Sequence, residues 1–341
     1  MSRIQRILIV KLSSFGDVIH ALPTLEGLRT AFPAAHITWL VEAAFAPLLM
    51  GHPALDEVWP VPRVRPGRKV EKDELLQLLR LARRMRVAAF DLVIDLQGLL
   101  KSAMWVALAK GKRKLGYDRT RELSYLALTE RLAPYDPETH AVWRYLNVAR
   151  HLGAPPAPPR FRLGLTPVLP PALLPLDRPL AVLHPGARWA TKLWPAASWA
   201  HLADWLIREK KLAAVITGSA GDRDLADQIC AQMQEKPLNL AGRTGLRELA
   251  GIMQQARLAV TADTGPMHLA AALGTRVVAV FGPTSPARTG PFGQGHRVVR
   301  LGLQCSPCFR RRCPEPRCLL DLPWHALRTA CEKILSIDVK N

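Results

Sequence analysis

The amino-acid sequence predicts an α/β fold made of two Rossmann-like domains, with parallel sheets that face each other across a cleft. The first observation is that short apolar runs alternate with helical periodicity in both halves of the 341-residue chain. Such runs are typical of strands that are buried on both faces of a parallel sheet. The second observation is the stretch 155–179, which holds nine prolines. Proline fixes φ and removes a backbone donor, so this stretch predicts a semi-rigid connector between two domains.

Each half contributes four predicted strands. Those of the first half are Ile7–Val10, Ile37–Val41, Val58–Val61 and Leu92–Ile94. Those of the second half are Leu180–Leu183, Ala213–Thr217, Leu258–Thr261 and Val277–Phe281. Apolar residues recur at helical spacing between them, as in Ala196–Glu209 and Leu246–Gln255. We therefore expect one domain over residues 1–165 and a second that begins at residue 166.

Composition and charge narrow the class of partner. Apolar residues make up 49% of the chain, and no apolar run approaches the roughly 18 residues of a membrane span. No signal-peptide pattern precedes the first strand, so we expect a cytoplasmic protein. The net charge is +19, and residues 60–121 hold 16 Lys and Arg against 6 Asp and Glu. No nucleic-acid motif accompanies these cations, so we expect no nucleic-acid partner. The cations indicate an anionic membrane surface or a phosphorylated substrate, and the simpler interpretation is a solvated basic face.

The segment KLSSFGDVIHALP, residues 11–23, directly follows the first predicted strand. Ligands of open α/β sheets bind at the carboxyl ends of the strands. Ser13, Ser14, Gly16 and Asp17 therefore lie where a ligand is expected. Asp17 has two interpretations: it is the N-cap of the following helix, or it is a catalytic base.

Four successive strand ends in the second half carry residues suited to phosphate. They are Thr191 with Lys192, Ser219, the turn Asp263-Thr264-Gly265 with His268, and the turn 281–286. Pro266 suits the first position of a helix, and a helix N-terminus presents N–H groups to an anion. Helix capping and an exposed lysine are the simpler interpretations of each residue alone, but their convergence predicts a nucleotide diphosphate. These strand ends contain no G-x-G-x-x-G fingerprint and no P-loop, and no Asp-x-Asp pair follows a strand.

Four cysteines lie close together near the end of the chain, at positions 305, 308, 313 and 318. The spacing of Cys305, Cys308, Cys313 and Cys318 on a proline-broken loop suits one tetrahedral site for structural zinc or iron. Disulfides are a second interpretation, which a reducing cytoplasm disfavours. Free thiols are the third. Four thiolates would leave no open coordination position, so such a metal would not be catalytic.

Several stretches resemble the ADP-heptose:lipopolysaccharide heptosyltransferases of glycosyltransferase family 9. They are VKLSSFGDVIHALP, DLVIDLQGLLKSA, GYDRTRELS, ATKLWP and VTADTGPMHLAAALGTRVVAVFGPTSP. The resemblance extends from about residue 4 to about residue 300. DLQGLLKSA and GYDRTRELS are similar to heptosyltransferase I, which acts on the Kdo residues of lipid A. HPGARWATKLWP is closer to heptosyltransferase II, and the four tail cysteines depart from the simplest type I enzymes.

The resemblance implies a GT-B fold and inverting transfer of L-glycero-D-manno-heptose from ADP-heptose to the Kdo region of lipid A. It implies an acceptor-binding domain over 1–165, an ADP-sugar-binding domain over 166–322 and a last helix within 323–341 that packs back on the first domain. It implies Asp17 as the base and no cofactor for catalysis. The donor-binding residues it implies are Ser13, Ser14, Gly16, Thr191, Lys192, Ser219, Asp263, Thr264, Gly265 and His268. The acceptor-binding residues it implies are Arg63, Arg65, Arg68, Lys69 and Arg121.

Inversion needs a single in-line displacement, in which an acceptor hydroxyl attacks as ADP leaves. A carboxylate that takes the hydroxyl proton contributes about 10²–10⁴ in rate. Without a metal, Lys192 and helix N-termini must meet the charge on ADP. The alternatives are heptosyltransferase II or another family 9 transferase with a different nucleotide sugar or acceptor, and a non-catalytic nucleotide-binding scaffold on the same fold. Such a scaffold has no use for Asp17, so its presence favours the enzyme, placed at the cytoplasmic face of the inner membrane.

Overall fold

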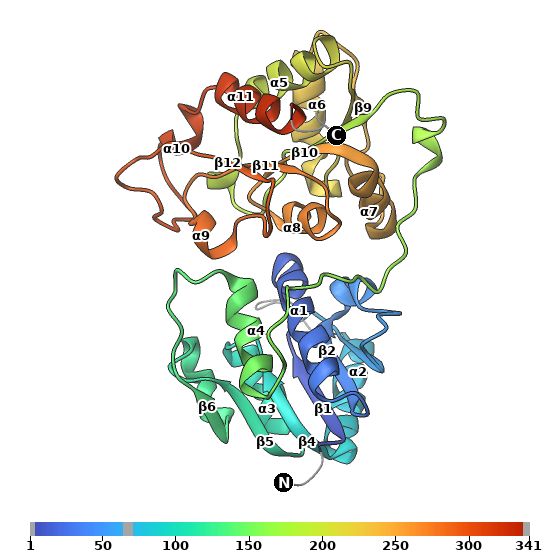
Figure 1. Ribbon diagram of the computed structural model, residues 1–341, viewed down its shortest axis with the longest axis vertical. Coiled ribbons are helices and arrows are strands. Elements are labelled where there is room, and N and C mark those ends of the chain that lie inside the picture. The colour runs from blue at the N-terminus through green and yellow to red at the C-terminus, as the bar shows by residue number, and fades with distance from the viewer. Residues whose placement is uncertain (1–3, 64–70, 337–341) are drawn as a thin grey trace. The chain divides into compact units, whose positions relative to one another are not determined.

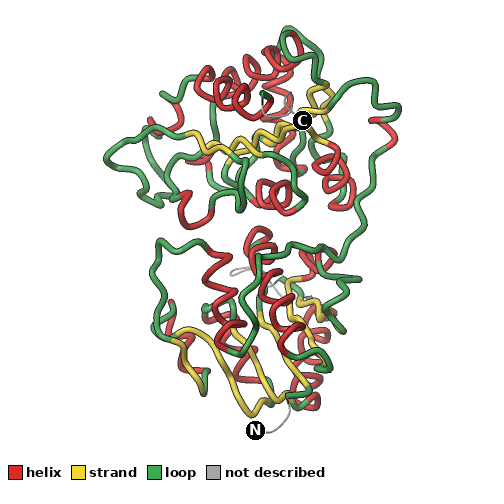
Figure 2. Tube along the Cα trace, in the orientation of Figure 1, coloured by secondary structure: helices red, strands yellow, loops and turns green. Residues whose placement is uncertain are grey.

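The computed structural model describes residues 4–63 and 71–336. The chain divides into two compact units, Met1–Leu165 and Thr166–Asn341. Each unit is built around one six-stranded parallel sheet, and helices cover both faces of each sheet (Figures 1 and 2). The predicted α/β class, with one parallel sheet in each half, is confirmed.

The sheet of the first unit has the strand order β3-β2-β1-β4-β5-β6. Its strands are β1 (Arg6–Val10), β2 (His36–Glu42), β3 (Glu57–Val61), β4 (Phe90–Asp95), β5 (Gly111–Tyr117) and β6 (Glu130–Leu132). Its helices are α1 (Phe15–Ala31), α2 (Lys72–Ala88), α3 (Leu100–Leu108) and α4 (Ala141–His151), with the 3₁₀ helices η1 (Ala43–Leu48) and η2 (Arg121–Ala127). The central strand β1 is buried over its last four residues, as its unbroken apolar run requires. Because all strands are parallel, their carboxyl ends share one edge.

The sheet of the second unit has the order β12-β11-β10-β7-β8-β9. Its strands are β7 (Leu180–His184), β8 (Ala213–Ile216), β9 (Leu238–Asn239), β10 (Ala256–Ala262), β11 (Val277–Val280) and β12 (Arg297–Val299). Its α-helices are α5 (Ala196–Arg208), α6 (Arg223–Gln232), α7 (Leu246–Gln255), α8 (Gly265–Ala272), α9 (Pro286–Thr289), α10 (Arg317–Leu320) and α11 (Trp324–Leu335). Its 3₁₀ helices are η3 (Pro171–Leu173), η4 (Ala190–Lys192) and η5 (Ala220–Asp222).

Strand β7 shows why the predicted strands lack a polar face. Ala181 and Leu183 pack into the core on one side of the sheet, while Leu180 and Val182 pack into the core on the other. Successive side chains of a strand point to opposite faces. A strand covered on both faces is therefore apolar over most of its length, as Leu180–Leu183 are in β7.

The last helix, α11, packs within the second unit. Leu327, Cys331 and Ile334 are buried in the core that also holds α5 and one face of the sheet. The expectation that this segment packs back on the first domain stays a prediction. The buried residues of α11 lie on the one face that this core covers.

The boundary between the units falls inside the proline-rich stretch 155–179. Its regular structure is the short η3 helix. Over the described residues, no helix has the length and apolar character needed to cross a membrane.

Candidate active site

Asp17 lies in the first turn of α1, at the carboxyl edge of the first sheet. Helix α1 begins at Phe15, and its N-cap is Ser14 rather than Asp17. One carboxylate oxygen, Oδ2, accepts hydrogen bonds from the Ser14 backbone N–H (3.0 Å) and from Ser14 Oγ (2.7 Å). The other oxygen, Oδ1, accepts one from the Tyr145 hydroxyl at 3.2 Å. Asp17 therefore contributes to capping, but its carboxylate also contacts α4, which capping alone does not require.

A cluster of charged groups surrounds the buried carboxylate of Glu42, at the end of β2. Lys101 Nζ lies 2.8 Å from Glu42 Oε1, and Arg63 Nε lies 3.7 Å from Oε2. Lys101 also donates a hydrogen bond to Ser13 Oγ. The backbone N–H of Ser13 donates to the side-chain oxygen of Gln97. Glu42 thus holds two cations next to the segment that carries Asp17. Lys101 was not predicted as a site residue, although it stands in the DLQGLLKSA stretch.

The structure describes one other predicted acceptor residue. Arg121 is exposed at the start of η2. Arg65, Arg68 and Lys69 lie outside the described residues. Arg63 is therefore the predicted acceptor residue whose contacts the structure gives.

The carboxylate of the DLQG segment has a structural role. Asp95 is buried at the end of β4 and accepts hydrogen bonds from the N–H groups of Gln97 (2.8 Å) and Gly98 (3.1 Å). Ser102 Oγ donates to it as well. Burial raises the pKa of Asp95, against the effect of these bonds. Asp95 fixes the turn that presents Gln97 to Ser13.

In the second unit, the partly buried Lys192 forms an ion pair with the buried Asp263 at the carboxyl edge of the sheet. Lys192 Nζ lies 2.6 Å from Asp263 Oδ2 and 3.3 Å from the Asp263 carbonyl oxygen. Thr284, in the predicted turn 281–286, donates its hydroxyl proton to the same Oδ2. Lys192 Nζ also lies 4.6 Å from the centre of the Trp189 ring. The structure therefore brings three of the four predicted strand ends together around one lysine.

Helix α8 begins next to this pair. Its N-cap is Thr264, its first residue is Gly265, and His268 is buried within its first turn. The N-terminal amides of a helix with no other partner favour an anion. A diphosphate bound here would face both these amides and the Lys192 ammonium.

Two predicted donor residues have hydroxyl groups that already serve other partners. Thr191 Oγ1 donates its proton to the Arg310 carbonyl at 2.9 Å. Ser219 Oγ donates to Asp222 at 2.6 Å, at the start of η5. A phosphate oxygen needs a hydrogen-bond donor, and a hydroxyl has only one proton. As the structure stands, neither side chain offers that proton to a ligand.

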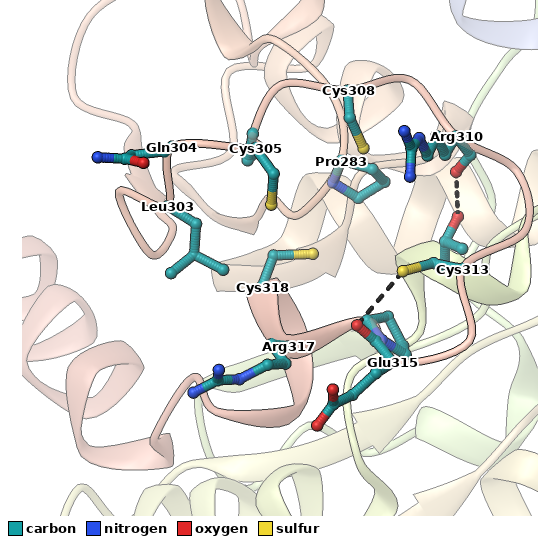
Figure 3. A pocket seen from close by; sticks show the side chains of 13 residues that line it. Pro283, Leu303, Gln304, Cys305, Cys308, Arg310, Cys313, Glu315, Arg317 and Cys318 are labelled. Carbon is teal, nitrogen blue, oxygen red and sulfur yellow. Dashed lines mark hydrogen bonds between the residues drawn. The ribbon is translucent and has the colours of Figure 1, made fainter.

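The four tail cysteines line one cavity of about 380 Å³, and Figure 3 shows their side chains directed toward its middle. All four are free thiols. Burial, and then the neighbouring thiols, raise the pKa of Cys318. Over the described residues, no group of three or more His, Cys, Asp and Glu side chains is arranged to hold a metal ion. The metal site therefore stays a prediction, and Thr191 links its loop to the Lys192 segment.

Comparison with known proteins identifies the family. The family model described as glycosyltransferase family 9 (heptosyltransferase) matches residues 78–319. The lipopolysaccharide heptosyltransferase 1 of Pseudomonas aeruginosa is 36% identical over 93% of this chain and 91% of its own length. That of Salmonella typhimurium is 31% identical over 89% of this chain and 94% of its own length.

Solved structures agree with these relatives. Escherichia coli heptosyltransferase WaaC with ADP has a TM-score of 0.79 at 27% identity, over 97% of this chain and 100% of that one. The ADP-heptose heptosyltransferase II of E. coli has a TM-score of 0.77 at 26% identity, over 98% and 99%. The implied GT-B fold is confirmed, and the chain belongs to glycosyltransferase family 9.

Proposed function

We propose that this protein is an inverting heptosyltransferase that moves L-glycero-D-manno-heptose from ADP-heptose to the Kdo region of lipid A, in synthesis of the lipopolysaccharide inner core. The names of its relatives support this, because those at 36% and 31% identity are type 1 enzymes, while type 2 enzymes follow at 29%. The WaaC relative was solved with ADP and with ADP-2-deoxy-2-fluoro heptose.

The single observation that carries the proposal is the fixed carboxylate of Asp17. In the reaction, the acceptor hydroxyl attacks the anomeric carbon while its proton passes to Asp17. Hydrogen bonds from Ser14 and Tyr145 fix the orientation of both carboxylate oxygens. Lys101 and Arg63, held by Glu42, would bind the carboxylate or phosphate groups of the acceptor.

Lys192 serves the leaving group. As the bond to the anomeric carbon breaks, negative charge develops on the ADP diphosphate. A fixed ammonium at this place stabilises that charge more in the transition state than in the ground state. Asp263 holds Lys192 in position through its 2.6 Å ion pair. No metal ion is needed for this assignment.

We further propose that the first unit docks on an anionic membrane, where its lipid acceptor is embedded. Helices α2 and α3 contact each other, and α3 contacts η2. Together they expose large apolar side chains, named here the α2–α3–η2 surface: Leu75, Leu76, Leu79, Leu100, Met104, Leu123 and Leu126. Exposed cations stand among them, such as Arg80 and Arg83 on α2. Apolar side chains ringed by Lys and Arg are the combination that binds an anionic lipid interface.

One experiment tests the reaction. The full chain is incubated with ADP-heptose, and separately with ADP-glucose and UDP-glucose, in the presence of Kdo-lipid A. Mass spectrometry then detects the sugar that is added. Addition of one heptose from ADP-heptose alone supports the proposal. Transfer only to an acceptor that already carries heptose would assign type 2 instead, and no transfer from any donor would favour a nucleotide-binding scaffold.

A further inference from the structure

Lys11 is a buried lysine that has no role in the transfer reaction as proposed above. It follows β1 directly and is 2% exposed. Removing an ammonium from water costs several kcal/mol unless polar partners replace the water. The partners of Lys11 Nζ are the Leu96 carbonyl at 3.1 Å and the Tyr145 hydroxyl at 2.8 Å. The second of these is the hydroxyl that contacts Asp17.

The hydrogen bonds of this group have one direction. An ammonium donates and cannot accept, so the Tyr145 oxygen accepts from Lys11. The Tyr145 proton therefore points to Asp17 Oδ1, 3.2 Å away. Burial raises the pKa of Tyr145 well above 10, so the phenol keeps this proton. The three side chains form a chain of donors that ends on the proposed base.

The hydrogen bonds from Lys11 to Tyr145 and from Tyr145 to Asp17 have two physical effects on the Asp17 carboxylate. Tyr145 holds Oδ1 while Ser14 holds Oδ2, so the carboxylate plane is fixed from both sides. In addition, the positive charge of Lys11 favours the ionised form of Asp17. The same attraction between the two charges raises the pKa of Lys11. Burial acts against this and lowers the pKa of Lys11 overall. The other charged or titratable groups that face the two side chains are Asp95, Lys101, Tyr135 and Arg144.

We propose that Lys11 and Tyr145 are positioning residues that orient Asp17 and keep it ionised until it takes the acceptor proton. The inference rests on the proposed role of Asp17. In the transfer step the acceptor oxygen bonds to the anomeric carbon, the bond from that carbon to the diphosphate breaks, and the acceptor proton moves to Asp17. Tyr145 and Lys11 keep their own protons throughout.

The test uses Tyr145→Phe in the full chain, with ADP-heptose and Kdo-lipid A as substrates. Loss of one fixed donor should lower kcat by about tenfold to a hundredfold, with KM for ADP-heptose unchanged. The acidic limb of the kcat profile should move up by about one pH unit, because the charged carboxylate loses a hydrogen bond. A purely structural role for Tyr145 would not move this limb. Tyr135→Phe is the matched control, since Tyr135 lies near Tyr145 and packs on Tyr117.

The variant Lys11→Gln separates the effect of the Lys11 charge from the effect of orienting Asp17. It also tests the inference if Tyr145→Phe does not fold, as shown by loss of its melting transition. Glutamine still donates to Tyr145 but carries no charge, so the acidic limb should move while kcat above that limb stays within about threefold of wild type. An unchanged limb in both variants would overturn the inference. If Asp17→Asn is inactive in that case, the inference alone fails. If Asp17→Asn is fully active, the proposed base fails as well.

Discussion

At the scale of single residues, Asp17 has a structural and a proposed chemical role that substitution can separate. In Asp17→Asn, the side-chain oxygen can still accept from the Ser14 backbone N–H, which now lies 3.0 Å from the carboxylate. An amide has only one acceptor oxygen, so the Tyr145 hydroxyl loses its acceptor, Oδ1. Stability should therefore fall by about 1–3 kcal/mol, while kcat falls by about 10²–10⁴ because an amide does not take the proton. Unfolding in urea and a mass-spectrometric transfer assay measure the two effects.

The control for Asp17 is Glu74→Gln. Glu74 accepts from the backbone N–H of Glu71 at the start of α2, the same kind of contact that Asp17 makes with Ser14. It should lose less than about 1 kcal/mol of stability and no activity. Full turnover in Asp17→Asn would leave Asp17 as a capping residue only.

Lys192 provides the second residue-scale prediction. Lys192→Ala should weaken ADP binding about tenfold and lower kcat by about 10²–10³, since a preorganised cation is lost where charge develops. Calorimetry with ADP and the transfer assay measure these effects. Lys210→Ala is the control, because Lys210 Nζ lies 5.1 Å from the Trp205 ring, much as Lys192 lies over Trp189. Equal ADP affinity and rate in both variants would make Lys192 an ordinary lysine.

His184 gives a prediction about pH. It is buried at the end of β7, where it is hydrogen bonded to Thr217 at 2.9 Å, and burial lowers its pKa from 6.5 to about 4. The unfolded chain takes up the proton near pH 6.5, while the folded chain does not until about pH 4. The stability that His184 contributes is therefore complete above pH 6.5, and about 3 kcal/mol is lost as pH falls through this window.

The measurement is the free energy of unfolding in urea at pH 7 and at pH 4.5. Replacing His184 by Asn should make the drop between these two values smaller than in the wild type. His201→Asn, on the exposed face of α5, should leave the drop unchanged. An equal drop in all three proteins would contradict the prediction. His52 has a pKa of about 4 for the same reason, so part of the drop should remain in His184→Asn.

The residues that the sequence analysis missed share one property. Lys11 and Tyr145 are 134 positions apart, and Ser13 and Lys101 are 88 positions apart. The position of Asp17 at the carboxyl end of the first strand was predictable because a strand, a turn and a helix start lie together in a single short segment. Tyr145 lies on the amphipathic helix α4. Helical periodicity predicts which face of α4 is buried, but it does not predict that the Tyr145 hydroxyl contacts the Asp17 carboxylate on α1.

At the scale of elements, predictability followed burial. The predicted strands correspond to β1–β4, β7, β8, β10 and β11, whose central positions are apolar and buried. Strand β5 was missed because its sequence, GKRKLGY, begins with exposed charges. Strand β9 has only two residues and leaves no periodic signal. Pairing with a neighbouring strand forms both, and pairing is not visible in the pattern of one segment.

The α2–α3–η2 surface yields an element-scale prediction. The double variant Leu79→Glu, Met104→Glu should bind liposomes with anionic lipid more weakly than wild type, since it replaces two apolar contacts by negative charges. In the wild type these side chains are 58% and 61% exposed, so folding should be unaffected. Each cation near such a surface contributes about 1 kcal/mol, so added salt should weaken wild-type binding as well. Co-sedimentation measures both effects.

The control for this surface lies in the second unit. Leu174→Glu replaces a leucine that is 59% exposed there, and it should leave binding unchanged. Equal binding of all variants, or binding that ignores lipid charge, would rule out the docking surface.

The cysteine loop keeps the prediction of a structural zinc or iron open to test. Elemental analysis is made on protein purified without chelators. About one equivalent of zinc or iron, lost in Cys308→Ser and retained in Cys230→Ser, would establish the site. Cys230 lies on α6, away from the loop that carries the other four. Less than about a tenth of an equivalent leaves the free-thiol interpretation.

At the scale of the whole molecule, the proposed reaction assigns a different substrate to each unit. The proposed base and the proposed acceptor cations belong to the unit Met1–Leu165, and the proposed diphosphate cation belongs to Thr166–Asn341. Each site lies at the carboxyl edge of its own sheet, as expected for open α/β sheets. Of the predicted donor residues, Ser13, Ser14 and Gly16 are in the first unit, and there Ser13 contacts Lys101 while Ser14 contacts Asp17.

Amide hydrogen exchange with each ligand separately tests this assignment. ADP should slow exchange in peptides that cover Lys192 and the start of α8, because a bound diphosphate accepts hydrogen bonds from helix N-terminal amides. Kdo-lipid A should instead slow exchange in peptides that cover Ser13–Asp17 and Lys101. In Lys192→Ala the ADP effect should shrink at matched ADP concentration, while in Asp17→Asn it should persist. Strong protection of Ser13–Asp17 by ADP alone would contradict this division, and it would return Ser13, Ser14 and Gly16 to the donor site.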